Sequence, residues 1–373
     1  KLFIQRRSRL GFEHYLKIFL SPSLPAERGW GGEAMDRNSL ILVTGAAGFI
    51  GSCMVGYLNR KGFNNIIIAD EFEDEEKKPN YIDKKIYQQI EREELFDWLE
   101  KKPVNIDFVF HLGARTDTTE FDYSIHEKLN VEYSKKVWNY CAVNRIPLIY
   151  ASSAATYGAG ELGYKDDHTI LEQLNPLNPY GVSKNEFDKW AVKQTNCPPF
   201  WAGLKFFNVY GPNEYHKQRM ASVVFHAFNQ IKQTGKVKLF RSHKPEFNNG
   251  EQLRDFIFVN DVVNIMFWMM NESMSQTSNV KKKEASLTSG IYNVGTGKAR
   301  TFNDLASAIF SAIGAEKNIE YIDTPEDIRD KYQYFTEADM SKLLKAGYSE
   351  KFFSLEEGVE TYVQNFLLPH KYY

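Results

Sequence analysis

The sequence predicts an α/β protein built on a doubly wound parallel sheet, and two observations support this prediction. Short apolar runs, typical of strands buried on both faces, alternate over residues 41–153 with longer segments of helical spacing. A glycine-rich turn joins the first strand to the first helix, with glycines at Gly45, Gly48 and Gly51. Strands that alternate with helices imply crossover connections, so we expect helices on both faces of the sheet.

The elements of the first half follow from apolar spacing and from the residues that end each segment. The opening run Leu40–Val43 predicts a strand, and the spacing from Ser52 to Leu58 predicts an amphipathic helix. The second strand, at residues 66–69, ends in Asp70. The expected elements that follow are a charged loop at 71–78, a helix at 79–103 that Pro103 would stop, a strand with its exit loop at 107–114, a helix at 130–144 and a strand at 147–153.

The second half is less regular and predicts a smaller, mixed α/β lobe. We expect a first domain over residues 35–207 and a second lobe over 208–373, with part of the C-terminal region returning to the first domain. Residues 273–289 are polar and without periodicity, which predicts an exposed loop insertion. The expected elements here are helices at 220–233 and 301–313 and strands at 237–240, 255–259 and 290–294.

The composition of the chain is that of an ordinary globular protein. It has 373 residues, of which 43% are hydrophobic and 25% charged, and its formal net charge is -2. No basic tract indicates a nucleic-acid partner, and no apolar run reaches the roughly 18 residues of a membrane helix. Cys53, Cys141 and Cys197 are scattered without CxxC spacing, so we expect a reduced, cytoplasmic protein with no metal site.

The first 34 residues are expected to stand apart from the folded domain. They contain Arg6, Arg7 and Arg9 but only short apolar patches, and they lack the continuous apolar core of a signal peptide. Met35 lies just ahead of the first strand, where a compact domain would begin. We expect residues 1–34 to be a disordered extension or an artefact of an upstream start.

The glycine turn is typical of a dinucleotide-binding (Rossmann) fold. Its three glycines would allow a tight turn, the approach of a pyrophosphate to the backbone, and close packing of the helix on the strand. The helix N-terminus would point its free N–H groups at the phosphate, and Asp70 lies where a ribose hydroxyl would be held. The alternative is an ordinary glycine-rich strand–helix turn, which the complete strand–helix–strand context disfavours.

The main catalytic candidates are Tyr180 and Lys184, four residues apart in the stretch YGVSK, together with Ser153 after a neighbouring strand. Spacing of four places the tyrosine and the lysine one turn apart on one face of a helix. An ammonium group beside a phenol lowers its pKa from about 10 and so makes it a better base. This set could move a proton from a carbinol while hydride leaves its carbon; the alternative is a surface YxxxK on a solvated helix.

Motifs spread over residues 41–365 carry a resemblance to a known family. The stretches TGAAGFIG, YASSAATYG and YGVSK are marks of the extended short-chain dehydrogenase/reductase superfamily, which the chain resembles. Within it, the chain is similar to the ADP-L-glycero-D-manno-heptose 6-epimerase family. The narrower matches are TDTTE (116–120), YASSAATYG (150–158), FFNVYGPNEYHK (206–217), MASVVFH (220–226), LRDFIFVNDV (253–262), YNVGTG (292–297) and YQYFTEADM (332–340).

The resemblance implies an isomerase that inverts C6 of ADP-heptose by transient oxidation with bound NAD(P), on the route to the lipopolysaccharide core. Hydride would return to the opposite face of the ketone, so each face needs an acid/base. Tyr180 can serve one face, and Lys217 stands where the family has the second group; taken alone, Lys217 could be a loop lysine that binds a diphosphate. Ser153 would orient the reacting oxygen, and Lys184 would hold the cofactor ribose and tune Tyr180.

The resemblance also implies a set of substrate contacts. Arg254 is chemically suited to grip a diphosphate, although it could instead pair with Asp255 or Asp261. His226 could instead be an ordinary helix residue, and Arg219 and the segment 241–243 depart from the family pattern. The expected substrate-binding residues are Asn208, Arg219, His226, Phe240, Arg254 and Tyr332.

The cofactor is expected to be NADP, as in the family. Two adjacent carboxylates, Asp70 and Glu71, would repel a 2′-phosphate and favour NAD. Lys77 or Lys78 could still reach such a phosphate. The expected cofactor-binding residues are Gly45, Gly48, Phe49, Ile50, Gly51, Asp70, Glu71, Lys77, Leu112, Gly113, Ala114, Arg115, Thr116, Asn130, Lys184 and Val209.

Two alternative functions remain open at this point. Another nucleotide-sugar epimerase, such as a UDP-hexose 4-epimerase, would not need Lys217. A non-catalytic NAD(P)-sensing protein would predict a broken catalytic set, whereas Ser153, Tyr180, Lys184 and Lys217 are all present. The expected partners are the ADP-heptose substrate and further copies of the chain in a homo-oligomer, with no nucleic acid and no membrane.

Overall fold

The computed structural model describes residues 35–275, 287–329 and 332–373. The described residues form one compact unit. The predicted extension at 1–34 lies outside the described residues, as does most of the polar stretch at 273–289. Helix α7 ends at Ser275, so the first three residues of that stretch are helical.

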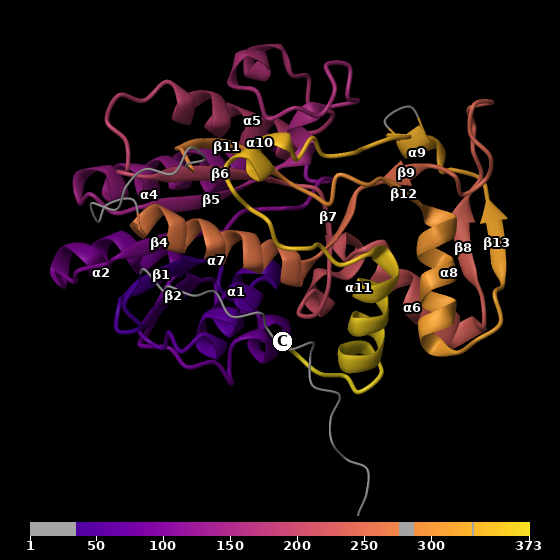
Figure 1. The fold of residues 1–373 in the computed structure, drawn as a ribbon, viewed down its shortest axis with the longest axis horizontal. Helices are drawn as coiled ribbons and strands as arrows, with labels where there is room; N and C mark the ends of the chain where they lie inside the picture. Colours follow the sequence, from indigo (N-terminus) through magenta and orange to yellow (C-terminus); the bar gives the residue numbers. More distant parts are fainter. Residues whose placement is uncertain (1–34, 276–286, 330–331) are drawn as a thin grey trace, which may run out of the picture. The chain divides into compact units, whose positions relative to one another are not determined.

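A seven-stranded parallel sheet forms the centre of this unit, which confirms the predicted fold class (Figure 1). The strand order is β11-β6-β5-β4-β1-β2-β3, and Val43 in β1 pairs with Ile68 of β2 on one side and Phe110 of β4 on the other. The strands are β1 (Ile41–Thr44), β2 (Ile66–Asp70), β3 (Gln88–Glu91), β4 (Phe108–His111), β5 (Leu148–Ser153), β6 (Trp201–Phe206) and β11 (Gly290–Val294).

The sheet changes direction between β1 and β4. From β1 the chain winds outward through β2 to β3, and from β4 it winds the other way through β5 to β6. Right-handed crossovers in opposite directions place their helices on opposite faces. A crevice therefore opens beyond the carboxyl ends of β1 and β4, where ligands bind in sheets of this kind.

Helices cover both faces of the sheet and seal its apolar strands. All residues of β1, β2 and β4 are buried, as expected for strands covered on both sides. On one face α1 packs against α7, with the Tyr57 and Phe267 rings 5.4 Å apart. The covering helices are α1 (Phe49–Arg60), α2 (Leu95–Lys101), α4 (Tyr133–Val143), α5 (Pro179–Val192) and α7 (Val259–Ser275).

A second group of elements lies beside the sheet, at the right in Figure 1. Strand β8 (Val237–Phe240) pairs in parallel with β13 (Ile319–Ile322), and helix α8 (Phe302–Ile313) packs on α6 and α11. Thr301 and Asp304 form a capping box that starts α8 at the predicted residue, and Gly314 ends it in the left-handed conformation. The neighbouring elements are α6 (Val223–Thr234), α11 (Leu355–Tyr362), β7 (Asn208–Tyr210) paired with β10 (Phe256–Phe258), and β9 (Leu253–Arg254) paired with β12 (Arg300–Thr301).

Short helical segments complete the fold. Two of them, η3 and η7, are π-helical, and η3 continues directly into α4. These segments are η1 (Glu75–Asn80), η2 (Arg92–Glu94), α3 (Tyr123–His126), η3 (Glu127–Glu132), η4 (Ala154–Tyr157), η5 (His168–Gln173), η6 (Tyr215–Met220), α9 (Glu326–Arg329), α10 (Ser341–Lys345) and η7 (Val363–Leu367).

The predicted helix over residues 79–103 is wrong in its first half. Residues 88–91 form β3, the edge strand that pairs with Ile67–Asp70, and the helix covers only Leu95–Lys101. Ile90 alone is buried in β3, so this edge strand has no alternating apolar pattern. The helix expected at 220–233 starts at Val223, because Ser222 is its N-cap. The Ser222 hydroxyl accepts a hydrogen bond from Phe225 N.

The described part of the chain offers neither a membrane-spanning helix nor a cluster of metal ligands. Among these residues, no helix is both long and apolar enough to cross a membrane. Over the same ranges, no group of three or more His, Cys, Asp or Glu side chains could hold a metal ion.

Candidate active site

A cavity of about 390 Å³ opens at the crevice where the sheet changes direction. Its walls come from the β1–α1 turn, the end of β2, the exit loop of β4 and the η6 segment. The lining residues are Thr44, Gly45, Gly48, Phe49, Ile50, Gly51, Ala69, Asp70, Glu71, Lys77, Arg92, Leu112, Gly113, Ala114, Arg115, Thr116, Asp117, Leu129, Tyr133, His216, Lys217, Gln218 and Met220.

The β1–α1 turn is packed so tightly that two of its glycines have no room for a side chain. Gly45 has φ +70°, and a Cβ placed there would lie 2.4 Å from the Gly113 nitrogen of the β4 exit loop. A Cβ at Gly51 would lie 2.0 Å from the carbonyl oxygen of Gly45. The turn therefore brings the start of α1 against the backbone of β1, which leaves the floor of the cavity as bare backbone.

The N-terminus of α1 is suited to bind an anion. Gly48 is the N-cap and provides no side-chain cap, so the first N–H groups of the helix have no partner within it. These groups belong to Phe49, Ile50 and Gly51, which line the cavity. With the positive end of the helix dipole, they form a site for a phosphate group.

Asp70 binds both the glycine turn and a lysine. Its carboxylate accepts hydrogen bonds from Ala47 N at 2.9 Å and Glu71 N at 2.8 Å. It also lies 3.4 Å from the Nζ of Lys77. The carboxylate that would hold a ribose therefore also fixes the turn below the phosphates.

Arg92 is a cavity residue that sequence reasoning missed. It follows β3 on η2, contacts Glu71 at 3.7 Å and donates to Glu93. Because residues 79–103 were expected to form a helix, no strand end was predicted there and Arg92 gave no signal. The other lining residues that were not predicted to bind the cofactor or substrate are Thr44, Ala69, Asp117, Leu129, Tyr133, His216, Gln218 and Met220.

Three predicted cofactor residues do not line the cavity. Asn130 is buried, accepts a hydrogen bond from Arg115 N at 2.8 Å, and donates to Ser183 Oγ at 2.9 Å. It therefore fixes the β4 exit loop from behind. Val209 lies in β7 opposite Ile257, and Lys184 lies on α5.

Tyr180 and Lys184 lie one turn apart on α5, as the spacing predicts. The side chain of Asn178 caps this helix by accepting a hydrogen bond from Gly181 N at 2.8 Å, and Pro179 lies in the first turn of the helix. Lys184 donates to the carbonyl oxygen of Ala151 at 2.9 Å. The helix is therefore tied to β5, the strand that ends in Ser153.

The pKa values of these side chains depend mainly on burial. Burial raises the pKa of the Tyr180 phenol, a hydrogen bond with Ser153 lowers it, and the charge of Asp188 raises it. Burial lowers the pKa of Lys184 to about 8, against a smaller opposing effect of Asp188. The hydrogen bond with Ser153 brings two of the predicted catalytic residues together.

Lys217 lines the cavity from η6. Its Nζ lies 5.7 Å from the centroid of the Phe49 ring, next to the α1 N-terminus. Burial lowers the pKa of Lys217, and the charge of Glu214 opposes this shift. Glu214 is itself buried and accepts a hydrogen bond from Ser222 Oγ at 2.7 Å.

Arg254, Phe240 and Tyr332 form a cluster in the second group of elements. The Arg254 guanidinium lies 5.4 Å from the Tyr332 ring centroid, and the Phe240 and Tyr332 rings are 5.8 Å apart. Arg254 donates to the carbonyl oxygens of Leu253 (2.9 Å) and Gln333.

Arg254 does not form an ion pair with Asp255 or Asp261, the alternative that the sequence left open. Asp255 accepts hydrogen bonds from Thr296 N at 2.7 Å and Ala338 N at 3.0 Å. Asp261 accepts one from Phe353 N at 3.1 Å.

The remaining predicted substrate residues lie apart from this cluster and outside the cavity lining. Asn208 is exposed in β7, and His226 is half-buried on α6. Arg219 is exposed on η6. Hydrogen bonds from Thr119 lower the pKa of Asp117, and the charge of Arg219 lowers it further. Arg219 therefore faces the β4 exit loop, which lines the cavity.

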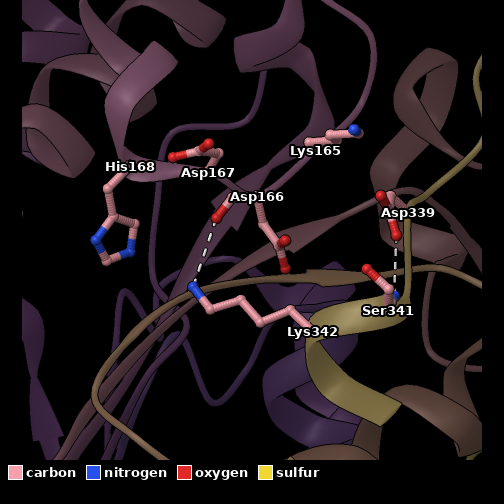
Figure 2. A pocket seen from close by; sticks show the side chains of 7 residues that line it. All are labelled: Lys165, Asp166, Asp167, His168, Asp339, Ser341 and Lys342. Carbon is pink, nitrogen blue, oxygen red and sulfur yellow. Dashed lines mark hydrogen bonds between the residues drawn. The ribbon is translucent and has the colours of Figure 1, made fainter. Parts of the chain in front are cut away.

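A second hollow, of about 470 Å³, lies at the edge strand β11 (Figure 2). Its side chains form hydrogen bonds with the free edge of that strand. His168 Nε2 accepts a hydrogen bond from Ile291 N at 3.0 Å, and Asp166 accepts one from Asn293 N at 2.8 Å. Lys342 donates to the carbonyl oxygen of Ile291 at 2.6 Å. These residues satisfy the backbone groups of the edge strand β11, whose residues are all buried, and we assign them a structural role.

The sequence profile of the NAD dependent epimerase/dehydratase family matches residues 41–295. The chain is 50% identical over 338 residues to an ADP-L-glycero-D-manno-heptose-6-epimerase from Fusobacterium nucleatum, covering 88% of this chain and 98% of that protein. It is 45% identical over 330 residues to a protein of the same name from Nitratidesulfovibrio vulgaris, with the same coverage.

Solved structures show the same similarity. The crystal structure of an ADP-L-glycero-D-manno-heptose-6-epimerase from Helicobacter pylori matches with a TM-score of 0.70 and 27% identity, over 90% of this chain and 97% of that one. MoeE5 in complex with UDP-glucuronic acid and NAD matches with a TM-score of 0.65 and 26% identity, over 87% and 98% of the two chains.

Proposed function

Because the chain belongs to the NAD dependent epimerase/dehydratase family, we propose that it is an ADP-L-glycero-D-manno-heptose 6-epimerase. It interconverts the D-glycero and L-glycero forms of ADP-β-D-manno-heptose, a precursor of the lipopolysaccharide core. The identity of 50% and 45% to relatives of that name, over 98% of their length, carries this conclusion. The structure adds side chains that suit the reaction. The amine of Lys217 lines the 390 Å³ cavity, and the phenol of Tyr180, which is not one of the lining residues, lies on α5.

The residues of the 390 Å³ cavity fit a nicotinamide dinucleotide. A floor without side chains at Gly45 and Gly51 and uncapped N–H groups at the start of α1 suit its pyrophosphate. Asp70 suits its ribose. When bound, NAD(P) accepts the hydride from C6 of the sugar and later returns it.

The chain's own residues handle the protons at C6. Tyr180 removes the proton from the C6 hydroxyl or returns it, and Ser153 donates a hydrogen bond that orients the same oxygen. Lys217 provides the second acid/base, which the opposite face of the intermediate ketone requires. Burial lowers the pKa of Lys217, and a lower pKa makes its neutral amine form more available as a base.

Arg254 would hold the diphosphate of the substrate. A guanidinium has five N–H donors, and two of its nitrogens here donate to the carbonyl oxygens of Leu253 and Gln333. The remaining donors can bind phosphate oxygens, while the rings of Tyr332 and Phe240 lie beside it.

NADP is the cofactor we propose. Two cations, Lys77 and Arg92, line the cavity beside Asp70 and Glu71 and could share a 2′-phosphate between them.

Lys77→Ala tests this choice, with Lys78→Ala as its control. Lys77 lines the cavity, whereas the adjacent Lys78 pairs with Glu75 outside it. We expect the nucleotide extracted from the purified protein to be NADP and its content to fall in Lys77→Ala alone. Extraction of NAD from the wild type, or equal losses in both variants, would overturn the proposal.

The reaction itself is tested by NMR of ADP-D-glycero-β-D-manno-heptose incubated with the protein and no added cofactor. Appearance of the L-glycero epimer would support the substrate, the reaction and a retained cofactor together. Turnover of a UDP-hexose instead would move the substrate to the 4-epimerase class. Failure to convert either substrate would favour a non-catalytic NAD(P)-binding protein.

Lys217→Met tests the second acid/base, with the exposed Lys232→Met on α6 as its control. We expect kcat to fall by about 10²-fold or more with little change in KM. A rise in KM with kcat unchanged would make Lys217 a phosphate ligand and remove it from the proton chemistry.

Two properties beyond the reaction are also proposed from the family resemblance. The enzyme acts in the cytoplasm, where nucleotide sugars are made, and it assembles into a homo-oligomer. Light scattering of the purified protein tests the second statement, and a monomer at micromolar concentration would contradict it.

A further inference from the structure

We propose that Asp188 and Lys205, a buried ion pair that the chemistry above does not use, are positioning residues that hold Ser153 and Tyr180 together and balance the charge beneath them. The inference rests on the proposed function for its activity assay, but its second measurement does not need a substrate. Asp188 lies on α5 and Lys205 on β6.

The pair is fully removed from solvent. Lys205 Nζ lies 3.2 Å from Asp188 Oδ2, and both side chains have 0% exposure. A buried ion pair is often no more stable than two apolar side chains of similar volume, because desolvation cancels the attraction. Stability alone therefore does not explain why two charges lie in the core directly below the catalytic residues.

Asp188 ties the catalytic helix to the strand that ends in Ser153. It accepts hydrogen bonds from Ser152 Oγ at 2.7 Å and from Tyr150 OH at 3.0 Å. Asp188 also lies one helical turn beyond Lys184 and two turns beyond Tyr180, on the same face of α5.

Lys205 fixes the other side of Ser153. Its Nζ donates to Thr156 Oγ1, and Thr156 in turn donates to the carbonyl oxygen of Ser153 at 2.8 Å. The same ammonium lies 4.7 Å from the centroid of the Tyr157 ring. The two members of the pair thus bind the residue before Ser153 and the turn after it.

The pair also sets the charge that the catalytic side chains experience. The charge of Asp188 raises the pKa of Tyr180 and of Lys184, in addition to the effects of burial. Lys205 forms the ion pair that offsets this charge, with its Nζ 3.2 Å from Asp188 Oδ2. The other titratable groups that face this site are His111 on β4, His126 on α3, Tyr157 on η4, Asp166 in the loop before η5, and His168 on η5.

Two single substitutions should move the pH dependence in opposite directions. Lys205→Met leaves the charge of Asp188 uncompensated, which disfavours the Tyr180 phenolate. The limb of the kcat–pH profile that is set by Tyr180 therefore moves to higher pH. Asp188→Asn leaves the charge of Lys205, so the same limb moves to lower pH. We expect each shift to be on the order of one pH unit.

The double variant Asp188→Asn/Lys205→Met separates positioning from charge and keeps the test open if a single variant fails to fold. With neither charge present, we expect the limb to return close to its wild-type position. We expect kcat to stay at least about tenfold below wild type with KM little changed, because Ser153 and Tyr180 are no longer held together. Lys193→Met, which removes an exposed ion pair with Glu172 at the end of α5, is the matched control and should change neither quantity.

A substrate-independent measurement completes the test. The Tyr180 resonance is followed by NMR of protein labelled at tyrosine Cζ and is assigned with Tyr180→Phe. Opposite shifts of its titration in the two single variants support the proposal even if ADP-heptose is not the substrate. Shifts in the same direction, or an unchanged titration and kcat in folded variants, would overturn it.

Discussion

Substituting Gly51 by alanine should abolish cofactor retention while leaving the fold intact. The added Cβ would lie 2.0 Å from the carbonyl oxygen of Gly45, and contacts below 3.0 Å do not occur, so the two segments must separate by at least about 1 Å. The atoms that must move belong to the backbone of the turn and of α1, and no flexible side chain can absorb the displacement.

The size of the effect follows from hydrogen-bond geometry. A displacement of about 1 Å moves an N–H···O distance from about 2.9 Å to 3.9 Å, beyond the range in which a hydrogen bond forms. Each hydrogen bond to a charged group contributes about 1.5–3 kcal/mol. Loss of two such bonds to the pyrophosphate costs about 3–6 kcal/mol, which is a factor of roughly 10² to 10⁴ in affinity.

The measurement is the molar ratio of bound nucleotide to purified protein, followed by titration with NADP and NAD. Gly56→Ala on the same helix is the control, since its Cβ meets the flexible side chain of Lys84 at 3.1 Å and a ring atom of Tyr373 at 3.1 Å. This control should keep its cofactor. If Gly51→Ala retains nucleotide at the wild-type ratio, the phosphates do not lie on this turn and the assignment of the cavity is wrong.

Three further results are expected. Tyr180→Phe should lower kcat by about 10² to 10⁴-fold and keep the bound nucleotide, because only the proton carrier is lost; unchanged turnover would remove Tyr180 from its role. Burial lowers the pKa of His111 to about 3, so between pH 6.5 and 3 the unfolded chain binds a proton that the folded chain excludes and stability falls as pH falls. Urea unfolding measures this effect at pH 7 and pH 5. Between these two pH values the free energy of unfolding of the wild type should fall by about 2 kcal/mol more than that of His111→Gln. An equal fall in the two proteins would contradict the prediction. Thr301→Ala should lower the free energy of unfolding by about 1 kcal/mol, since it removes the cap of α8, and an unchanged melting temperature would show that the capping box does not contribute.

Much of the sheet was predictable because its signals are local. Strands β1 and β2 contain the apolar runs 41–43 and 66–69, and such runs follow from burial on both faces of the sheet. The β1–α1 turn was predictable from the spacing of its glycines. The contact that excludes a side chain at Gly51 is local, with Gly45, whereas the contact at Gly45 is with Gly113 of the β4 exit loop. Local packing thus leaves a local signature in the sequence.

Edge strand β3 illustrates what local patterns leave out. It pairs with β2 through its backbone, and Ile90 is its one buried residue, so its sequence QQIE carries no strand pattern. This error also hid Arg92, which follows β3 and lines the cavity that we propose to bind the cofactor. A residue whose position depends on long-range pairing gives no signal in its own neighbourhood.

The proposed substrate-binding residues rest on the family resemblance only. Arg254, Phe240 and Tyr332 are distant in sequence, and no spacing rule brings them together in the cluster that the structure shows. Lys205 is different, since a lysine inside the apolar run WAGLKF is itself a signal for a buried partner. That partner, Asp188, could be named only when the packing of α5 on the sheet was known.

The position of Lys217 in the cavity wall depends on contacts between the segment 213–217 and helix α1. Asn213, four residues earlier, is buried with φ 73° and donates to Ser52 Oγ at 2.8 Å, directly after the glycine turn. Its carbonyl oxygen also accepts a hydrogen bond from Asn80 at 3.1 Å. The segment that carries the proposed second acid/base is therefore anchored to α1, the helix that would bind the phosphates. Because one helix fixes both groups, a shift of α1 would move the cofactor and Lys217 together and preserve the distance on which the second proton transfer depends.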